Sequence, residues 1–121
     1  MAGRFPIYVD ADVHGPLVDG LIHAGWDVVR AIDAFRERTG DPVHFEHAVR
    51  TGRVLVSNDR HMRELGERWY AEGRRFPGLV WWHRRHYARM GVGEILEAFE
   101  RIARRDDPFS AYPILAIGSE R

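Results

Sequence analysis

The sequence contains no cysteine and no lysine, and its apolar runs are short. The absence of cysteine excludes a disulfide framework, a cysteine-ligated zinc site and a cysteine nucleophile, and it fits the reducing cytoplasm, where we expect this protein to act. No run approaches the roughly 18 apolar residues that a transmembrane helix needs, so we expect no association with a membrane. The first residues, MAGRFPIYVDADV, also lack the pattern of a signal peptide, because Asp10 interrupts a very short apolar run.

The charges balance, because 18 arginines oppose 18 acidic residues and give a formal net charge of zero. A global field that attracts nucleic acid is therefore absent, and any contact with nucleic acid must come from a local patch. The chain has 121 residues, of which 45% are hydrophobic and 30% are charged, proportions that are ordinary for a globular protein. We expect a single domain over residues 1–121, large enough to bury one core without disulfides.

Strand-like and helix-like segments alternate along the chain. Short apolar runs bounded by turn residues predict strands at 5–11, 26–31, 53–57, 78–83 and, as an edge strand, 112–118. Apolar residues at helical spacing predict helices at 14–25, 41–52, 60–73 and 91–105, and the polar stretch 32–40 is left unassigned. The alternation predicts an α/β fold, a three-layer α/β/α sandwich around a mostly parallel central sheet.

Acidic residues follow the ends of two predicted strands. Asp10 and Asp12 come at the carboxyl end of the first strand, and Asp59 follows the third. Because the carboxyl ends of parallel strands gather at one edge of a sheet, we expect Asp10 and Asp59 to face one another. Asp41 is predicted to cap the helix that precedes the third strand, and Glu46 lies about one turn further along it.

Such a cluster of carboxylates is unfavourable without a neutralising cation. Two carboxylates about 4 Å apart repel by about 4 kcal/mol at an effective dielectric constant near 20. A hard divalent cation such as Mg²⁺ suits oxygen ligands, and the chemistry that follows is hydrolysis of a phosphate ester. Structural alternatives remain for single acids: Asp41 and Asp59 as helix caps, and Glu46 as a solvated side chain. Asp10 is the hardest to explain structurally, because it interrupts a buried strand.

Four segments, IYVDADV, GWDVV, GDPVHFEHAVRTGRVLVSNDRHM and PGLVWW, together resemble the PIN-like domain family, relatives of the PIN ribonucleases of toxin–antitoxin systems. The resemblance covers about residues 5–83 in order and spacing. It implies a PIN-like fold, Mg²⁺- or Mn²⁺-dependent cleavage of RNA, an antitoxin protein as a candidate partner and a homodimer as a candidate assembly. The implied site has Asp10, Asp41 and Asp59 as catalytic metal ligands, Asp12 and Glu46 as further ligands or their supports, and Ser57 and Asn58 as lining residues.

The chain departs from the family pattern at His61 and Met62, where the family often has a second acid and then phenylalanine. Losing that carboxylate removes a ligand for a second metal ion. His61 has three interpretations: a ligand for a softer ion such as Mn²⁺, an acid with an ordinary pKa of about 6.5, or an exposed first-turn residue. The departure keeps a non-catalytic alternative open, a degenerate PIN-like module that binds RNA, metal or a partner protein.

Three further patterns bear on function. Histidine pairs at 44/47 and 83/86 invite a zinc site, but the HExxH pattern is absent. The segment WWHRRHYAR (81–89) interleaves aromatic rings with arginine, as contacts to single-stranded RNA require, although a strand end followed by a solvated loop explains it equally well. IYVDADV also fits the opening motif of haloacid-dehalogenase-type phosphatases, with Asp10 as nucleophile and Asp12 as acid. Those enzymes normally use a lysine, which this chain lacks.

Overall fold

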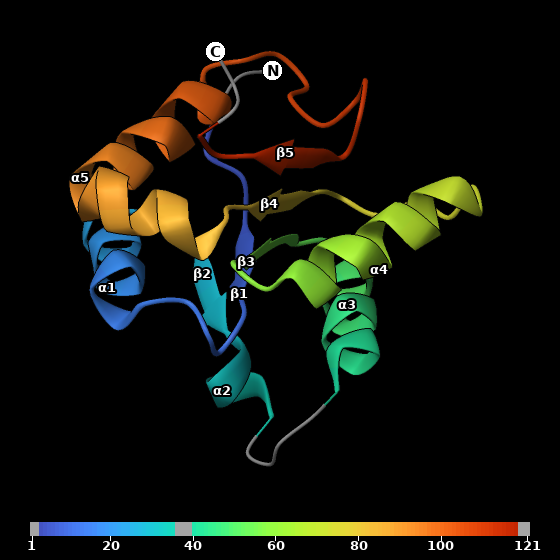
Figure 1. Cartoon of the computed structure of the whole chain (residues 1–121). Helices are drawn as coiled ribbons and strands as arrows, with labels where there is room; N and C mark the ends of the chain where they lie inside the picture. Colours follow the sequence, from blue (N-terminus) through green and yellow to red (C-terminus); the bar gives the residue numbers. More distant parts are fainter. Residues whose placement is uncertain (1–2, 36–39, 119–121) are drawn as a thin grey trace.

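The computed structural model describes residues 3–35 and 40–118, without the side chains of residue 84 and residues 86–88. Within these residues, the centre of the molecule is one sheet of five parallel strands (Figure 1). In spatial order the strands are β2 (Val28–Arg30), β1 (Ile7–Val9), β3 (Val54–Ser57), β4 (Leu79–Trp81) and β5 (Ile114–Ala116). The predicted α/β sandwich is confirmed, and the sheet expected to be mostly parallel is parallel at every described pairing.

The two central strands are buried along their whole length. Every residue of β1 and β3 is buried, which explains why both are unbroken apolar runs instead of alternating ones. Successive side chains point to opposite faces of a strand, so Ile7 and Val9 enter one hydrophobic core while Tyr8 enters the other. This burial fixes the register of β1 against β3, in which Tyr8 pairs with Leu55.

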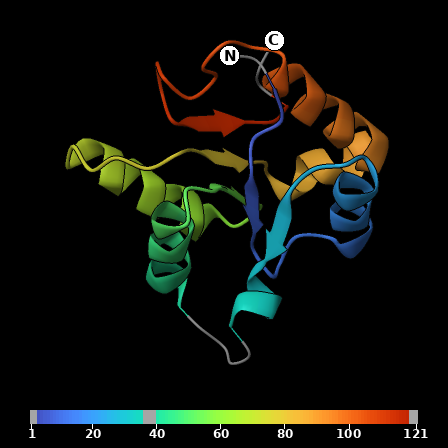
Figure 2. The same ribbon diagram turned by 180° about the vertical axis from the view of Figure 1, so that it is seen from behind.

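Two long helices cover each face of the sheet in the described part of the chain (Figures 1 and 2). One face carries α1 (Gly15–His23) and α5 (Arg84–Ala103), and the other carries α3 (Asp41–Arg50) and α4 (Arg60–Ala71). A short helix, α2 (Ala31–Ala34), directly follows β2 in the stretch that the sequence left unassigned; residues 36–39 of that stretch lie outside the described residues. Among the described helices, none combines the length and hydropathy of a transmembrane span.

α5 is longer than the helix predicted at 91–105. Gly91 has a φ of 72° and divides α5 into two helical parts, a conformation that glycine adopts readily because it lacks a Cβ atom. The first part begins after His83, whose Nδ1 accepts a hydrogen bond from the backbone N–H of Arg85 at 3.2 Å. The segment after β4, for which a solvated loop was one interpretation, is therefore helical.

The crossover through α5 differs from the one before it. The connections β3–α4–β4 and β4–α5–β5 step in the same direction across the sheet, yet α4 and α5 lie on opposite faces. The two crossovers therefore have opposite hands, although about 98% of parallel crossovers in proteins are right-handed. As a result, α5 packs beside α1, the first helix of the chain, instead of beside α4.

The direction in which the chain winds reverses beside β1. The chain passes outward from β1 to β2 and then returns past β1 to β3. The carboxyl ends of β1 and β3 thus form a topological switch point, the position at which open α/β sheets bind their ligands. The polar residues that follow these two strands are consequently the first place to look for a functional site.

Candidate metal centre

Three carboxylates converge at the switch point. One oxygen from each of Asp10, Asp41 and Asp59 lies within 4.8 Å of the oxygens of the other two. Asp10 directly follows β1, Asp59 stands two residues after β3, and Asp41 is the first residue of α3. Elements far apart in the sequence therefore bring together the three acids that were predicted to be catalytic metal ligands. We call these three residues the acidic triad.

Asp10 is the most buried member of the triad, with 7% of its surface exposed. The Ser57 hydroxyl donates a hydrogen bond to Oδ2 of Asp10 at 2.9 Å. The backbone N–H of Asp10 donates to the carbonyl of Val56, also at 2.9 Å. Burial raises the pKa of Asp10 above its ordinary value, and the charges of Asp12 and Asp41 raise it further, against the opposing effect of the Ser57 hydrogen bond. Ionised Asp10 is therefore electrostatically unfavourable in this position, and a bound cation would stabilise it.

Asp59 combines a structural and an electrostatic role. As the N-cap of α4 it accepts a hydrogen bond from the backbone N–H of His61 at 2.9 Å. Its own backbone N–H donates to the hydroxyl oxygen of Ser57 at 3.0 Å. Ser57 is fully buried and therefore links two members of the triad. The prediction that Asp59 caps a helix is confirmed. The same residue also contributes an oxygen to the acidic triad.

Asp41 is not the N-cap that the sequence predicted. Gly40 occupies that position in an extended conformation, without a side-chain hydrogen bond, and Asp41 lies in the first turn of α3. The helix dipole stabilises a negative charge there, but burial and then the charge of Asp59 raise the pKa of Asp41. His44 and His61 lower that pKa, and Asp12 raises it.

The two remaining predicted ligands lie at the margin or outside. Asp12 is exposed, although its charge is felt at both Asp10 and Asp41. Glu46 is also exposed and does not join the triad within the described residues. Its separation of five residues from Asp41 turns it by about 140° around the helix axis, since each residue of an α-helix advances about 100°.

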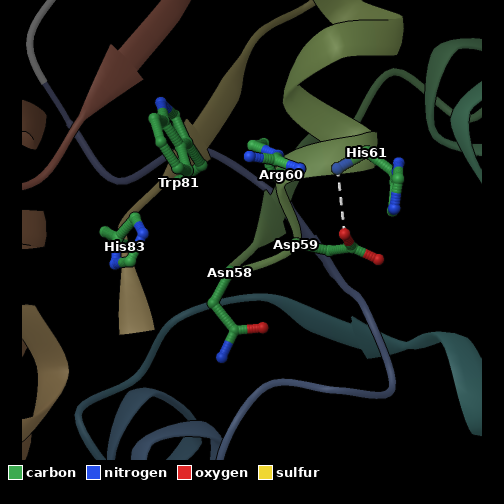
Figure 3. A pocket seen from close by; sticks show the side chains of 6 residues that line it. All are labelled: Asn58, Asp59, Arg60, His61, Trp81 and His83. Carbon is green, nitrogen blue, oxygen red and sulfur yellow. Dashed lines mark hydrogen bonds between the residues drawn. The ribbon is translucent and has the colours of Figure 1, made fainter. Parts of the chain in front are cut away.

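His61 and Asn58 lie beside Asp59 at the border of the triad (Figure 3). The side chain of His61 is 73% exposed, and its Nδ1 lies 3.8 Å from Glu64. Asn58, Asp59 and His61, together with Arg60, Trp81 and His83, line a pocket of about 260 Å³ (Figure 3). Of the predicted lining residues, Ser57 donates a side-chain hydrogen bond to Asp10, and His61 donates its backbone N–H to the carboxylate of Asp59.

A buried pair behind the triad was not found by sequence reasoning. The hydroxyl of Tyr8 and Nδ1 of His44 are 2.9 Å apart, and both side chains are buried. The ring of Phe35 packs edge-on against His44 at 5.3 Å and against His47 at 5.1 Å. The spacing of His44 four residues before the buried Ala48 was the signal that it belongs to the inward face of α3.

The Tyr8–His44 hydrogen bond counts against the zinc site that the histidine pair 44/47 suggested. His44 is engaged with Tyr8, and within the described residues no metal-binding group of three or more His, Cys, Asp or Glu forms other than the acidic triad. The second histidine pair includes His86, whose side chain lies outside the described residues.

The donor set of the triad indicates which metal it could hold. Three carboxylates offer only oxygen, which suits hard divalent cations such as Mg²⁺, Mn²⁺ or Ca²⁺ better than soft metals. Burial and mutual repulsion both disfavour three negative charges, so a divalent cation would be stabilised by the same arrangement that is unfavourable without one. The geometry therefore defines an acidic site that could hold a metal ion.

Comparison with known proteins gave no match: no family model, no curated protein and no solved structure is significantly similar to this chain. What the protein does must therefore be inferred from the site itself.

Proposed function

We propose that this protein is a metal-dependent ribonuclease of the PIN-like type, which hydrolyses phosphodiester bonds at the acidic triad. The observation that carries the proposal is the convergence of Asp10, Asp41 and Asp59 to within 4.8 Å at the switch point of a parallel sheet. The order of the motifs along the chain and the location of Asp10 and Asp59 after neighbouring strands support the same conclusion.

In this proposal the three carboxylates would hold one divalent cation, Mg²⁺ or Mn²⁺. When bound, such a cation lowers the pKa of a coordinated water and offsets negative charge on the attacked phosphate. Ser57 orients Asp10 by donating to Oδ2, and the backbone N–H of His61 orients Asp59. Within the described residues only these three acids converge as possible ligands, so a single metal ion fits the site better than a pair.

The partners follow from the same proposal. An RNA strand would reach the triad from the pocket beside β4, where Arg60 and Trp81 stand next to Asp59. If the protein is the toxin of a toxin–antitoxin pair, its antitoxin would act by covering this edge of the sheet. Nothing in the geometry favours the phosphatase alternative, because Asp12, its required acid, is exposed and no lysine is present to stabilise a phosphoryl intermediate.

The test is cleavage of a mixed-sequence single-stranded RNA in the presence of Mn²⁺, Mg²⁺ or EDTA. Asp10→Asn is purified in parallel, and Glu46→Gln serves as the matched control, since Glu46 is an exposed acid outside the triad. We expect cleavage that needs the metal, that disappears in Asp10→Asn and that persists in Glu46→Gln. A folded wild-type protein that binds Mn²⁺ but cleaves nothing would refute the ribonuclease and leave the binding module in its place.

A further inference from the structure

The pocket beside the acidic triad has a composition that the metal chemistry does not require. It lies between the carboxyl ends of β3 and β4 and includes Asp59 as one of its walls (Figure 3). A volume of about 260 Å³ is just below the roughly 300–1,000 Å³ of pockets for drug-sized ligands. It suits one small planar group and not the width of a duplex.

The aromatic side chain of this pocket is in contact with a cation. The side chain of Trp81 is half-buried at the end of β4, and the guanidinium of Arg63 lies 4.8 Å from the centre of its ring. A cation over the face of an indole is attracted to the ring, and Arg63 is itself within 3.9 Å of Glu67. The ring is therefore preoriented, which lowers the entropy cost of stacking a ligand on it.

Polar groups around the ring have the character of contacts to a nucleotide. Arg60 is exposed at the pocket and is paired only loosely, with its Nε 3.5 Å from Glu64, so its guanidinium is available to a phosphate. A cationic group that is available to a phosphate thus stands beside a flat aromatic surface.

We propose that this pocket binds one unpaired nucleotide of the RNA, with its base stacked on Trp81 and its phosphate held by Arg60. The inference rests on the proposed function and deepens it, because it names the two residues that would hold the nucleotide beside the scissile bond. A base in a duplex is stacked on its neighbours and cannot enter a pocket of this size, whereas an unpaired base can be turned outward onto an aromatic ring. Because Asp59 belongs to both the pocket and the triad, the bound nucleotide lies next to the metal ligands.

The test measures binding separately from cleavage. A fluorescently labelled single-stranded RNA hexamer is titrated with protein in a buffer that contains Ca²⁺, and binding is followed by fluorescence anisotropy. Trp81→Leu removes the ring, Trp81→Phe keeps a stacking surface, and Arg60→Gln removes the cation. Tyr70→Leu is the matched control, because Tyr70 is an exposed aromatic residue near the other end of α4.

We expect Trp81→Leu to weaken binding about 5- to 150-fold, the range that corresponds to the roughly 1–3 kcal/mol of one base–aromatic stack. Trp81→Phe recovers most of the affinity, Arg60→Gln weakens binding and reduces its dependence on salt, and Tyr70→Leu binds like wild type. Duplex RNA of the same sequence competes poorly. Unchanged binding in both Trp81→Leu and Arg60→Gln, or equal competition by the duplex, overturns the proposal.

A failure of the nucleotide-pocket proposal can be distinguished from a failure of the proposed ribonuclease function. Thermal shifts with Mn²⁺ that equal those of wild type show that the variants retain the fold and the triad. Loss of binding in Trp81→Leu, in a protein that cleaves nothing, supports the nucleotide pocket and refutes the ribonuclease. Metal-dependent cleavage that is unaffected by either substitution refutes the pocket and leaves the ribonuclease standing.

Discussion

Replacing one carboxylate of the acidic triad by its amide should make the metal-free protein more stable. In Asp10→Asn the new amide group would keep an oxygen that accepts from Ser57, so the buried hydrogen bond at 2.9 Å survives the change. The amide also brings an N–H donor toward the neighbouring carboxylates instead of a negative charge. The substitution therefore removes repulsion while preserving the local structure.

The magnitude follows from the geometry. At the 4.8 Å limit of the cluster, each fully ionised pair repels by about 3.5 kcal/mol at an effective dielectric constant near 20. Asp41 and Asp59 are only half-buried, so water screens much of this repulsion. We expect a net gain of about 1 kcal/mol, which corresponds to about 3–6 °C in melting temperature for a chain of this length.

The assay is thermal unfolding in EDTA and again in excess Mn²⁺. In EDTA, Asp10→Asn should melt above wild type, whereas Glu46→Gln should melt with it. In Mn²⁺ the order should reverse, because ligand at about 100 times its dissociation constant stabilises a native site by about 2.7 kcal/mol, and Asp10→Asn lacks one ligand. A lower metal-free melting temperature in both Asp10→Asn and Asp41→Asn would show that these acids are structural anchors, and the reasoning from repulsion would be refuted.

Two further predictions concern pH and the helix cap. Asp10 and Asp41 have pKa values raised above the ordinary value of the unfolded chain, so their ionisation disfavours the fold at neutral pH. The stability advantage of Asp10→Asn in EDTA should therefore shrink as the pH is lowered from neutrality through the raised folded-state pKa. An advantage that grows on acidification would contradict the raised pKa. Asp59→Ala and Asp59→Asn both remove the charge, but only asparagine keeps the capping oxygen. In denaturant unfolding Asp59→Ala should therefore be about 0.5–2 kcal/mol less stable than Asp59→Asn, and equal stability of the two variants would exclude the capping role.

Much of the architecture could be predicted because burial leaves a clear record in sequence. The unbroken apolar run of β3 and the run of β1 indicated strands covered on both faces, and that coverage requires helices on both sides. The alternation then predicted parallel connections and placed Asp10 and Asp59 at the same edge. The first half of α5 was missed because its arginine-rich sequence has no apolar stripe, and because Gly91 reads as a boundary although the chain is helical on both sides of it.

The site was predictable to the level of strand ends but not of side-chain direction. Asp10 directly follows β1 and Asp59 stands two residues after β3, so the topology of the sheet brings them together. Glu46 was assigned by nearness in sequence to Asp41, and helical rotation carries it away from the triad. The surroundings of the site include a hydrogen bond between Tyr8 and His44 and the contact of Trp81 with Arg63. Both join segments that are distant in the sequence, and no local sequence pattern specifies such contacts.

The opposite-handed crossover has a consequence for the order in which the molecule can assemble during synthesis. The face covered by α3 and α4 can close once about the first 80 residues have emerged, because both helices lie between strands of that stretch. The face beneath α1 must wait for α5, since Ile95, Phe99 and Ile102 fill the core between them. Until α5 has been synthesised, the core around Val9 and Val56 is closed only by α1, and a nascent chain with hydrophobic surface left open in this way is prone to aggregate.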